Sequence, residues 1–172
     1  MQANKLKLKL VIGLGNPDKK YTNTYHNVGF LAVDFLTKNP PIFNSQFLIS
    51  KSDEYMNNSG RFAAKMLKKH NVKSENLLII QDDSDLKIGQ YKFTEPGHSA
   101  AGHHGIESVQ QYVPNKFWRL RIGIRPPEEK IRQKAEKFVL KKISSAHKKI
   151  LEEVFEETAQ EIKKPYKTAF SG

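Results

Sequence analysis

The sequence predicts a single α/β domain over residues 1–172, with three α/β/α layers and a mixed, largely parallel central sheet. Short apolar runs typical of buried strands alternate along the chain with segments whose apolar residues recur at helical spacing. Alternating strands and helices are typical of a sheet covered by helices on both faces. A chain of 172 residues that is 38% hydrophobic, without internal repeats or a low-complexity linker, suits one core.

The residue pattern of the first part of the chain predicts a strand, a loop, a helix and a further short strand. Lysine and leucine alternate over residues 5–10, so the strand starts half exposed, and it continues into the buried pair Val11-Ile12. The glycines and proline of residues 13–17 break it. Apolar residues at helical spacing from Val28 to Leu36 predict a helix, which Asn39-Pro40-Pro41 ends, and residues 47–49 predict a short strand.

The second part continues the alternation. Ser59 is expected to cap a helix with an apolar face over residues 62–67, and Leu77–Ile80 is expected to be a buried strand closed by an acidic loop at residues 81–85. Further strands are expected at residues 91–93 and 118–125. A loop over residues 97–105 leads into a helix over residues 106–113, and a last helix runs from about Ser144 to Ile162.

The charge of the chain limits its partners. Lysine and arginine number 29 against 18 acidic residues, a net charge of +11. Such an excess favours nucleic acid or an anionic membrane surface, although a lysine-rich surface without a specific partner is the alternative. No apolar run approaches the roughly 20 residues of a membrane-spanning helix, so we expect no membrane partner.

The absence of cysteine excludes disulfides, thiolate zinc sites and cysteine nucleophiles. Residues 1–10 lack the apolar core of a secretory signal and the pattern of a transit segment. We therefore expect a cytoplasmic protein, with a mitochondrial or other organellar location as the alternative if a presequence has been removed.

Polar residues follow two of the predicted strands. Asn16 comes just after the first strand, and Asp82 just after Leu77–Ile80. In open α/β sheets, sites form outside the carboxyl ends of the strands, so these two residues are expected at one edge.

His26, at the mouth of the first helix, is the candidate base. A histidine has an ordinary pKa of about 6.5, which suits proton transfer near neutrality. If Asp82 holds one ring nitrogen, the other is free to act as a base. No Ser-x-Gly nucleophile elbow is present, so the base is expected to activate water directly.

Other residue patterns carry weaker signals. Gly13-Leu14-Gly15 lacks the third glycine of a dinucleotide fingerprint. The histidines at 98, 103 and 104 and the nearby aspartates lack the spacing of metal ligands, so we expect no metal and no cofactor. Tyrosines 21, 25 and 55 could stack on unpaired bases or could simply pack in the fold. Arg121 could meet a phosphate or lie on a solvated strand face.

Four segments together resemble the bacterial-type peptidyl-tRNA hydrolase family over nearly the whole chain. The first is Gly13-Leu14-Gly15-Asn16-Pro17, through Tyr21, to His26-Asn27-x-Gly29. The second is Tyr55-Met56-Asn57-x-Ser59-Gly60, and the third is Asp82 to Leu86 with Gly89. The fourth is Gly102-His103-His104-Gly105, followed by residues 119–124. Their order and spacing match the family.

The resemblance implies hydrolysis of the ester between a peptide and the 3′ ribose of tRNA. It implies His26 as the base and Asp82 as the residue that orients it. It implies binding roles for the peptide or the acceptor end at the remaining positions: Asn16, Tyr21, Tyr55, Met56, Asn57, His103, His104 and, as a clamp on the 5′ phosphate, Arg121. The implied partner is tRNA, with the ribosome as a second candidate, and a monomer is expected.

The chain departs from the family pattern at several positions. Tyr25, Gln81, Thr94 and His104 stand where arginine, histidine, lysine and asparagine are usual, and the segment from Ile42 to Tyr55 is short. These departures leave a second hypothesis open, in which the protein is a catalytically impaired RNA-binding derivative of the fold that acts in ribosome assembly or splicing.

Overall fold

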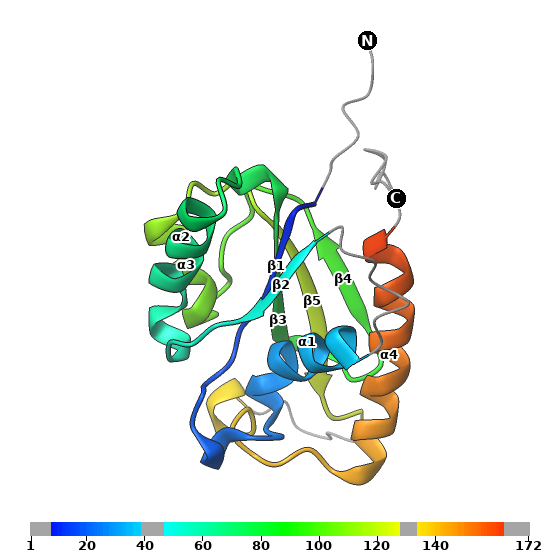
Figure 1. Cartoon of the computed structure of the whole chain (residues 1–172). Helices are drawn as coiled ribbons and strands as arrows, with labels where there is room; N and C mark the ends of the chain where they lie inside the picture. Colours follow the sequence, from blue (N-terminus) through cyan, green and yellow to red (C-terminus); the bar gives the residue numbers. More distant parts are fainter. Residues whose placement is uncertain (1–7, 39–46, 128–133, 164–172) are drawn as a thin grey trace.

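Five strands form one sheet in the order β2-β1-β3-β5-β4 (Figure 1). The computed structural model describes residues 8–38, 47–127 and 134–163. The strands are β1 (Leu10–Gly13), β2 (Leu48–Lys51), β3 (Leu77–Lys87), β4 (Tyr91–Thr94) and β5 (Trp118–Arg125). β1 pairs in parallel with β2 and β3, β3 pairs in parallel with β5, and only β4 runs antiparallel among these pairs. The predicted mixed, largely parallel sheet is confirmed.

Helices cover both faces of this sheet. α1 (Val28–Lys38) and α4 (Ser145–Lys163) lie on one face, and α2 (Ser59–Lys69) and α3 (His104–Tyr112) lie on the other (Figure 1). Each face has its own apolar cluster: Ile80, Leu120 and Phe155 belong to the first, and Ile79 and Ile106 to the second. The chain therefore has the three-layer architecture that the sequence predicted.

Two local predictions were wrong. Residues 81–85 are not a loop, because β3 continues to Lys87 and Asp82 pairs with Ile122 of β5. The neighbouring strand supplies backbone partners whatever the side chains are, so the acidic residues do not end the ladder. Ser59 does not cap α2; it is the first residue of the helix, follows Asn58, and its hydroxyl donates to the carbonyl of Met56.

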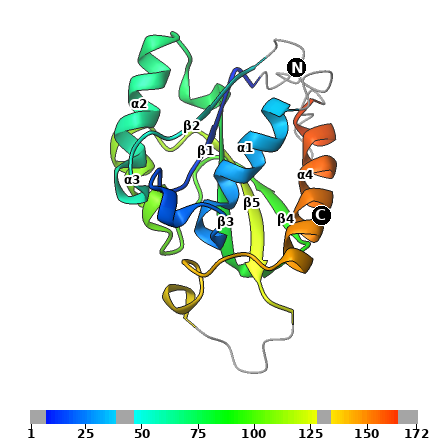
Figure 2. The same ribbon diagram turned by 60° about the horizontal axis from the view of Figure 1, so that its bottom comes forward.

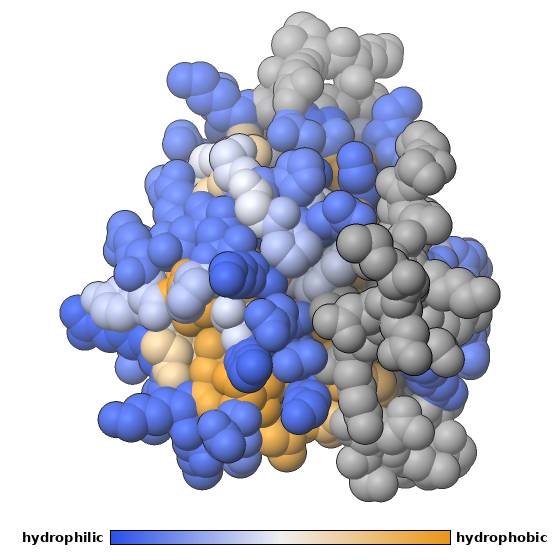
Figure 3. Space-filling view, turned by 90° about the horizontal axis from the view of Figure 1, so that it is seen from above, coloured by the Kyte–Doolittle hydropathy of each residue, from blue (hydrophilic) through white to orange (hydrophobic). Residues whose placement is uncertain are grey.

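Two predicted boundaries lie outside the described residues: the start of the first strand at Leu6 and the stop at Asn39-Pro40-Pro41. Among the described residues, no helix is both long and apolar enough to cross a membrane. The end of the molecule opposite the site described below is mostly hydrophilic where its residues are described, with one apolar area (Figure 3).

Glycines allow α1 to lie directly on the ends of β1 and β3. A Cβ on Gly29 would lie 2.5 Å from the carbonyl oxygens of Ile80 and Leu14, and one on Gly13 would lie 2.3 Å from the carbonyl oxygen of Gly29. Real side chains do not approach a backbone so closely. The two glycines therefore fix how near the start of α1, and the residues just before it, come to the edge of the sheet.

Candidate active site

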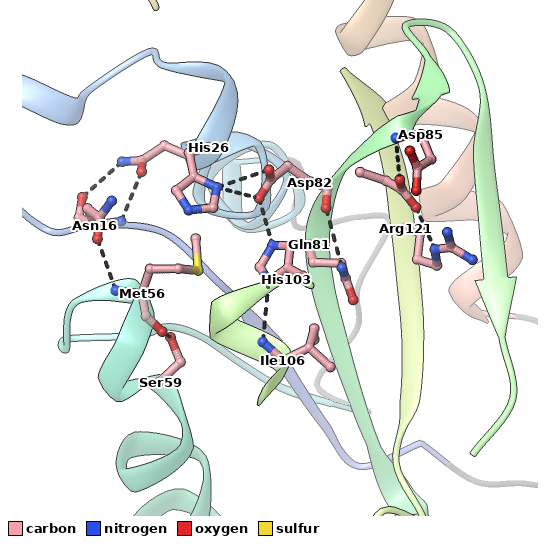
Figure 4. Close-up of polar contacts among 12 residues, drawn as sticks. Asn16, His26, Met56, Ser59, Gln81, Asp82, Asp85, His103, Ile106 and Arg121 are labelled. Atoms are coloured by element: carbon pink, nitrogen blue, oxygen red, sulfur yellow. Dashed lines mark hydrogen bonds and ion pairs between the residues drawn. The ribbon is translucent and has the colours of Figure 1, made fainter. Parts of the chain in front are cut away.

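His26 and Asp82 meet at the carboxyl edge of the sheet (Figure 4). A short 3₁₀ helix, η2 (Tyr25–Asn27), carries His26, and β3 carries Asp82. The Nδ1 atom of His26 lies 2.9 Å from both carboxylate oxygens of Asp82. A carboxylate can only accept, so the proton is on Nδ1 and the Nε2 lone pair of His26 is free.

His103 is a second histidine on the same carboxylate. Its Nε2 lies 3.0 Å from Oδ1 of Asp82, and its Nδ1 accepts a hydrogen bond of 3.3 Å from the backbone N–H of Ile106, which caps α3. The cap requires an unprotonated Nδ1, so the proton of neutral His103 is on Nε2 and points at Asp82. The sequence placed His103 near the acceptor end of tRNA but did not predict this contact.

The contacts among His26, His103 and Asp82 shift the pKa values of His26 and Asp82. Burial by itself would lower the pKa of His26, but the charge of Asp82 and the hydrogen bond outweigh it and raise that pKa above 6.5. Burial would raise the pKa of Asp82, which is 3% exposed, yet His26 and His103 together hold it well below its usual range. Asp82 is therefore ionised throughout the neutral range.

A segment from the far end of the chain holds the His26 loop in place. The backbone N–H of His26 donates to the carbonyl of Val139 at 2.8 Å, and that of Tyr25 donates to Lys141 at 3.2 Å. The ammonium of Lys142 donates to the carbonyls of Lys20 and Thr22. Figure 2 shows this segment passing beneath the ends of the strands.

Tyr25 belongs to the support of the loop and does not face the substrate side. It is buried, its hydroxyl lies 2.6 Å from Nδ1 of His147 on α4, and its ring packs edge-on against Phe138. Tyr25, one of the expected departures from the family pattern, therefore packs between the loop and α4.

Asn16 is fixed from three sides beside this centre. Its Oδ1 accepts from the backbone N–H of Met56 at 2.9 Å, and its own backbone N–H and carbonyl bond the side chain of Asn27 (Figure 4). These contacts set the orientation of the Asn16 amide and leave its Nδ2 without a hydrogen-bond partner among the described residues. Asn27 was not predicted as a site residue, although it stands in the motif His26-Asn27-x-Gly29, which is the signal that could have identified it.

The remaining predicted residues near Asn16 lie at the rim. Tyr55 is 45% exposed and its hydroxyl donates to Asp18 at 2.5 Å. Asn57 is exposed in the short helix η4 (Met56–Asn58). The ring of Tyr21 is partly buried and lies under the ammonium of Lys20.

His104 and Arg121 both have partners within the protein. The side chain of His104 is 67% exposed, and its Nδ1 lies 3.0 Å from a carboxylate oxygen of Glu107. Nε of Arg121 donates to the buried carboxylate of Asp83 at 2.5 Å. Arg121 is therefore neither a free cation nor a residue of a solvated strand face.

A cavity of about 300 Å³ lies on the side of His26, Asp82 and Arg121, and Asn16, Tyr55 and Asn57 are not among its lining residues. His26, Asp82, His103 and Arg121 line it, and so do residues that were not predicted as site residues: Gln81, which was noted only as a departure from the family pattern, and Arg119, Ser99, Ala101 and Glu136. Arg119 precedes Arg121 by two in the strand and shares its face, so the alternation in residues 118–125 is the signal that could have identified it.

The histidines and Asp82 could also hold a metal ion. The ligand atoms of His26, Asp82 and His103 all lie within 4.8 Å of one another. Direct hydrogen bonds already link both imidazoles to the carboxylate, so the arrangement is complete with protons alone. His98 and His104, which the sequence grouped with His103, are not part of this set.

Comparison with known proteins places the chain in a family. The model of the peptidyl-tRNA hydrolase family matches residues 10–171. The peptidyl-tRNA hydrolase of Aquifex aeolicus (strain VF5) is 34% identical over 170 residues, 89% of this chain and 87% of that protein, and that of Wolbachia pipientis wMel is 34% identical over 154 residues, 80% and 83%. The crystal structure of peptidyl-tRNA hydrolase from Acinetobacter baumannii superposes with a TM-score of 0.76 at 27% identity, covering 92% of this chain and 88% of that one. This chain belongs to the peptidyl-tRNA hydrolase family.

Proposed function

We propose that the protein hydrolyses the ester of peptidyl-tRNA and releases free tRNA, with His26 as the general base. The observation that carries the proposal is the contact between Nδ1 of His26 and buried Asp82, which leaves the lone pair of Nε2 available on a side chain that lines the cavity. Ester hydrolysis needs a positioned base, a water molecule and hydrogen bonds to the developing oxyanion.

The reaction follows from the tautomer of His26. Nε2 takes a proton from a water molecule as its oxygen attacks the ester carbonyl, and Asp82 stabilises the imidazolium that forms. The tetrahedral intermediate collapses with cleavage of the bond between the acyl carbon and the ribose oxygen. The imidazolium then returns its proton to that oxygen, so the products are a peptide acid and a tRNA with a free hydroxyl.

Asn16 and Asn57 are suited to recognise the peptide. The fixed Oδ1 of Asn16 leaves Nδ2 as a donor for a main-chain carbonyl, which a blocked aminoacyl group offers. A free ammonium group offers no acceptor and is repelled by an N–H donor. Exposed Asn57 can bind the next peptide unit in the same way, with Met56, Tyr21 and Tyr55 beside it.

The rest of the proposal concerns tRNA. A net charge of +11 favours a polyphosphate substrate, and Arg121 can bind a phosphate if the substrate competes with Asp83. His103 and His104 lie at the cavity, where the acceptor end would enter. We further propose that the protein acts as a cytoplasmic monomer, with the ribosome as a second candidate partner. The intact contact between His26 and Asp82 supports the enzyme over the impaired RNA-binding derivative.

Release of peptide from N-blocked aminoacyl-tRNA by the purified protein tests the proposal. A general base typically contributes about 10²–10⁴-fold, so His26→Ala should lose at least 10²-fold in kcat. His70→Ala is the matched control, because His70 follows α2 away from the cavity. A His26→Ala protein that keeps more than about a tenth of the wild-type rate would exclude His26 as the base.

A further inference from the structure

The outward side of α2 carries a row of basic side chains, which we call the α2 ridge. It consists of Arg61, Lys65, Lys68 and Lys69, all of them exposed. Their spacing of i, i+4, i+7 and i+8 places them on one side of the helix, while the other side packs into the apolar cluster shared with α3. A helix rises about 1.5 Å per residue, so the ridge is about 12 Å long and presents a cation about every 6 Å.

The ridge has almost no compensating charge. Residues 55–74 include neither aspartate nor glutamate. The three lysines of the ridge form no ion pair within the part of the chain that the structure describes. Nε of Arg61 donates to the hydroxyl of Tyr112 at 3.1 Å, and this contact, more than the charge of Glu54, raises the pKa of Arg61 above its usual range. The ridge is therefore a row of charges that is open to a partner.

Such a row is unfavourable for the isolated helix. Like charges four residues apart on a helix repel each other. The helix dipole favours Lys68 and Lys69 in the last turn, but it opposes Arg61 in the first turn. The exposed side of α4, by contrast, carries both signs, with Lys149 and Glu153 as examples. The excess of basic residues is thus concentrated on α2, and a partner of opposite charge would relieve the repulsion.

The composition of the ridge indicates the class of that partner. Lysine is depleted in interfaces between proteins. A helix that lies on a membrane inserts its apolar side chains, whereas α2 turns its apolar side to the core. A regular row of cations suits the regularly spaced phosphates of a double-helical nucleic acid, which are recognised with little regard to sequence.

The ridge lies apart from the cavity. Figure 4 shows Ser59, the first residue of α2, on one side of His26 and Arg121 on the other. From Ser59, α2 runs away from the site toward the opposite end of the sheet, and no residue of the ridge lines the cavity (Figure 1). We propose that the α2 ridge binds the phosphate backbone of an RNA duplex other than the substrate tRNA, while the site remains free for the acceptor end. The choice of RNA rests on the proposed function.

Binding of a blunt-ended RNA duplex, measured by fluorescence anisotropy at several salt concentrations, tests the inference. Each phosphate that a lysine neutralises contributes slightly less than one unit to the slope of log affinity against log salt, so the double variant Lys65→Gln/Lys69→Gln should flatten the slope by about two units. Lys148→Gln/Lys149→Gln changes a matched pair of exposed lysines on α4 and should keep the wild-type slope. Equal slopes in the two double variants would overturn the inference.

The hydrolysis assay separates the ridge from the substrate site. Lys65→Gln/Lys69→Gln should cleave N-blocked aminoacyl-tRNA with the wild-type kcat and KM, and added duplex should leave the KM of wild type unchanged. A duplex that raises the KM of wild type but not that of the double variant would place the ridge within the tRNA site and overturn the inference. Binding of phosphatidylglycerol vesicles in place of the duplex, lost in the double variant, would also overturn it. If the double variant loses the duplex but wild type cleaves no ester, the ridge stands and the proposed function fails.

Discussion

At the scale of single residues, one carboxylate organises the site. Asp82 accepts from His26 and from His103; the carboxylate itself fixes the tautomer of His26, whereas the N–H of Ile106, which donates to Nδ1, fixes that of His103. The two rings lie 5.5 Å apart between centroids. A change at Asp82 therefore alters both histidines, whereas a change at either histidine leaves the carboxylate one donor.

Asp82→Asn should lower kcat by at least about 10²-fold, because an amide neither stabilises the imidazolium nor selects the Nδ1–H tautomer. It should also shift the pH profile. Asp82 raises the pKa of His26, and the base must be neutral, so the acid limb of kcat/KM lies above 6.5 in wild type. Without the carboxylate that pKa falls, and the limb should move to lower pH. A residual rate with an unshifted limb would show that another group titrates.

His104→Asn tests the position at the start of α3 where the chain is expected to depart from the family pattern. His104 faces Glu107 and is mostly exposed, so its ring is not held against the catalytic centre. We expect the asparagine variant to keep a rate within about threefold of wild type, as exposed substitutions usually have small effects. A marked gain in rate, together with a less steep acid limb in the pH–rate profile, would instead assign His104 a contact with substrate or water.

At the scale of elements, the site depends on how closely α1 approaches the sheet. Gly29→Ala places a methyl group 2.5 Å from two backbone carbonyl oxygens, which cannot move independently of β1 and β3. We expect a loss of about 1–3 kcal/mol in the free energy of unfolding, as for other overpacked cores, and a lower kcat because α1 carries the His26 loop away from Asp82. Denaturant unfolding and the peptide-release assay measure the two effects.

Gly97→Ala is the matched control for the Gly29 prediction. Gly97 has a positive φ of 94° but open space around its Cβ position, so its substitution strains the backbone without pushing an element. It should cost stability without a comparable loss of kcat. An equal loss of kcat in both variants would contradict the role assigned to the α1 approach.

The sequence predicted elements better than it predicted contacts. Periodicity located the strands and helices, because it reports which side of an element is buried. It could not show that β3 extends through Asp82, since that depends on β5 lying alongside. It also could not show the contact of Tyr25 with His147, which joins residues 122 apart in the chain. The family motifs predicted His26, Asp82 and Asn16 as site residues, whereas Gln81 was noted only as a departure from the pattern and Asn27 only as a position within a motif.

At the scale of the whole molecule, charge should govern the affinity for tRNA. Each phosphate neutralised contributes slightly less than one unit to the slope of log affinity against log salt. Arg121→Ala should flatten that slope by about one unit, and Arg121→Lys should retain it. Equal slopes for wild type and Arg121→Ala in a filter-binding titration would show that Arg121 remains with Asp83 in the complex.

The backbone hydrogen bonds between the His26 loop and residues 139–143 have a consequence for the synthesis of the protein. A ribosome delivers the N-terminal quarter of the chain first, but His26 receives its support only when Val139 and Lys141 have emerged and folded back. An incomplete nascent chain of this protein is itself a peptidyl-tRNA. Its His26 therefore lacks the hydrogen bonds that hold it in position as a base. Synthesis has to be nearly complete before the chain can acquire the activity proposed for it.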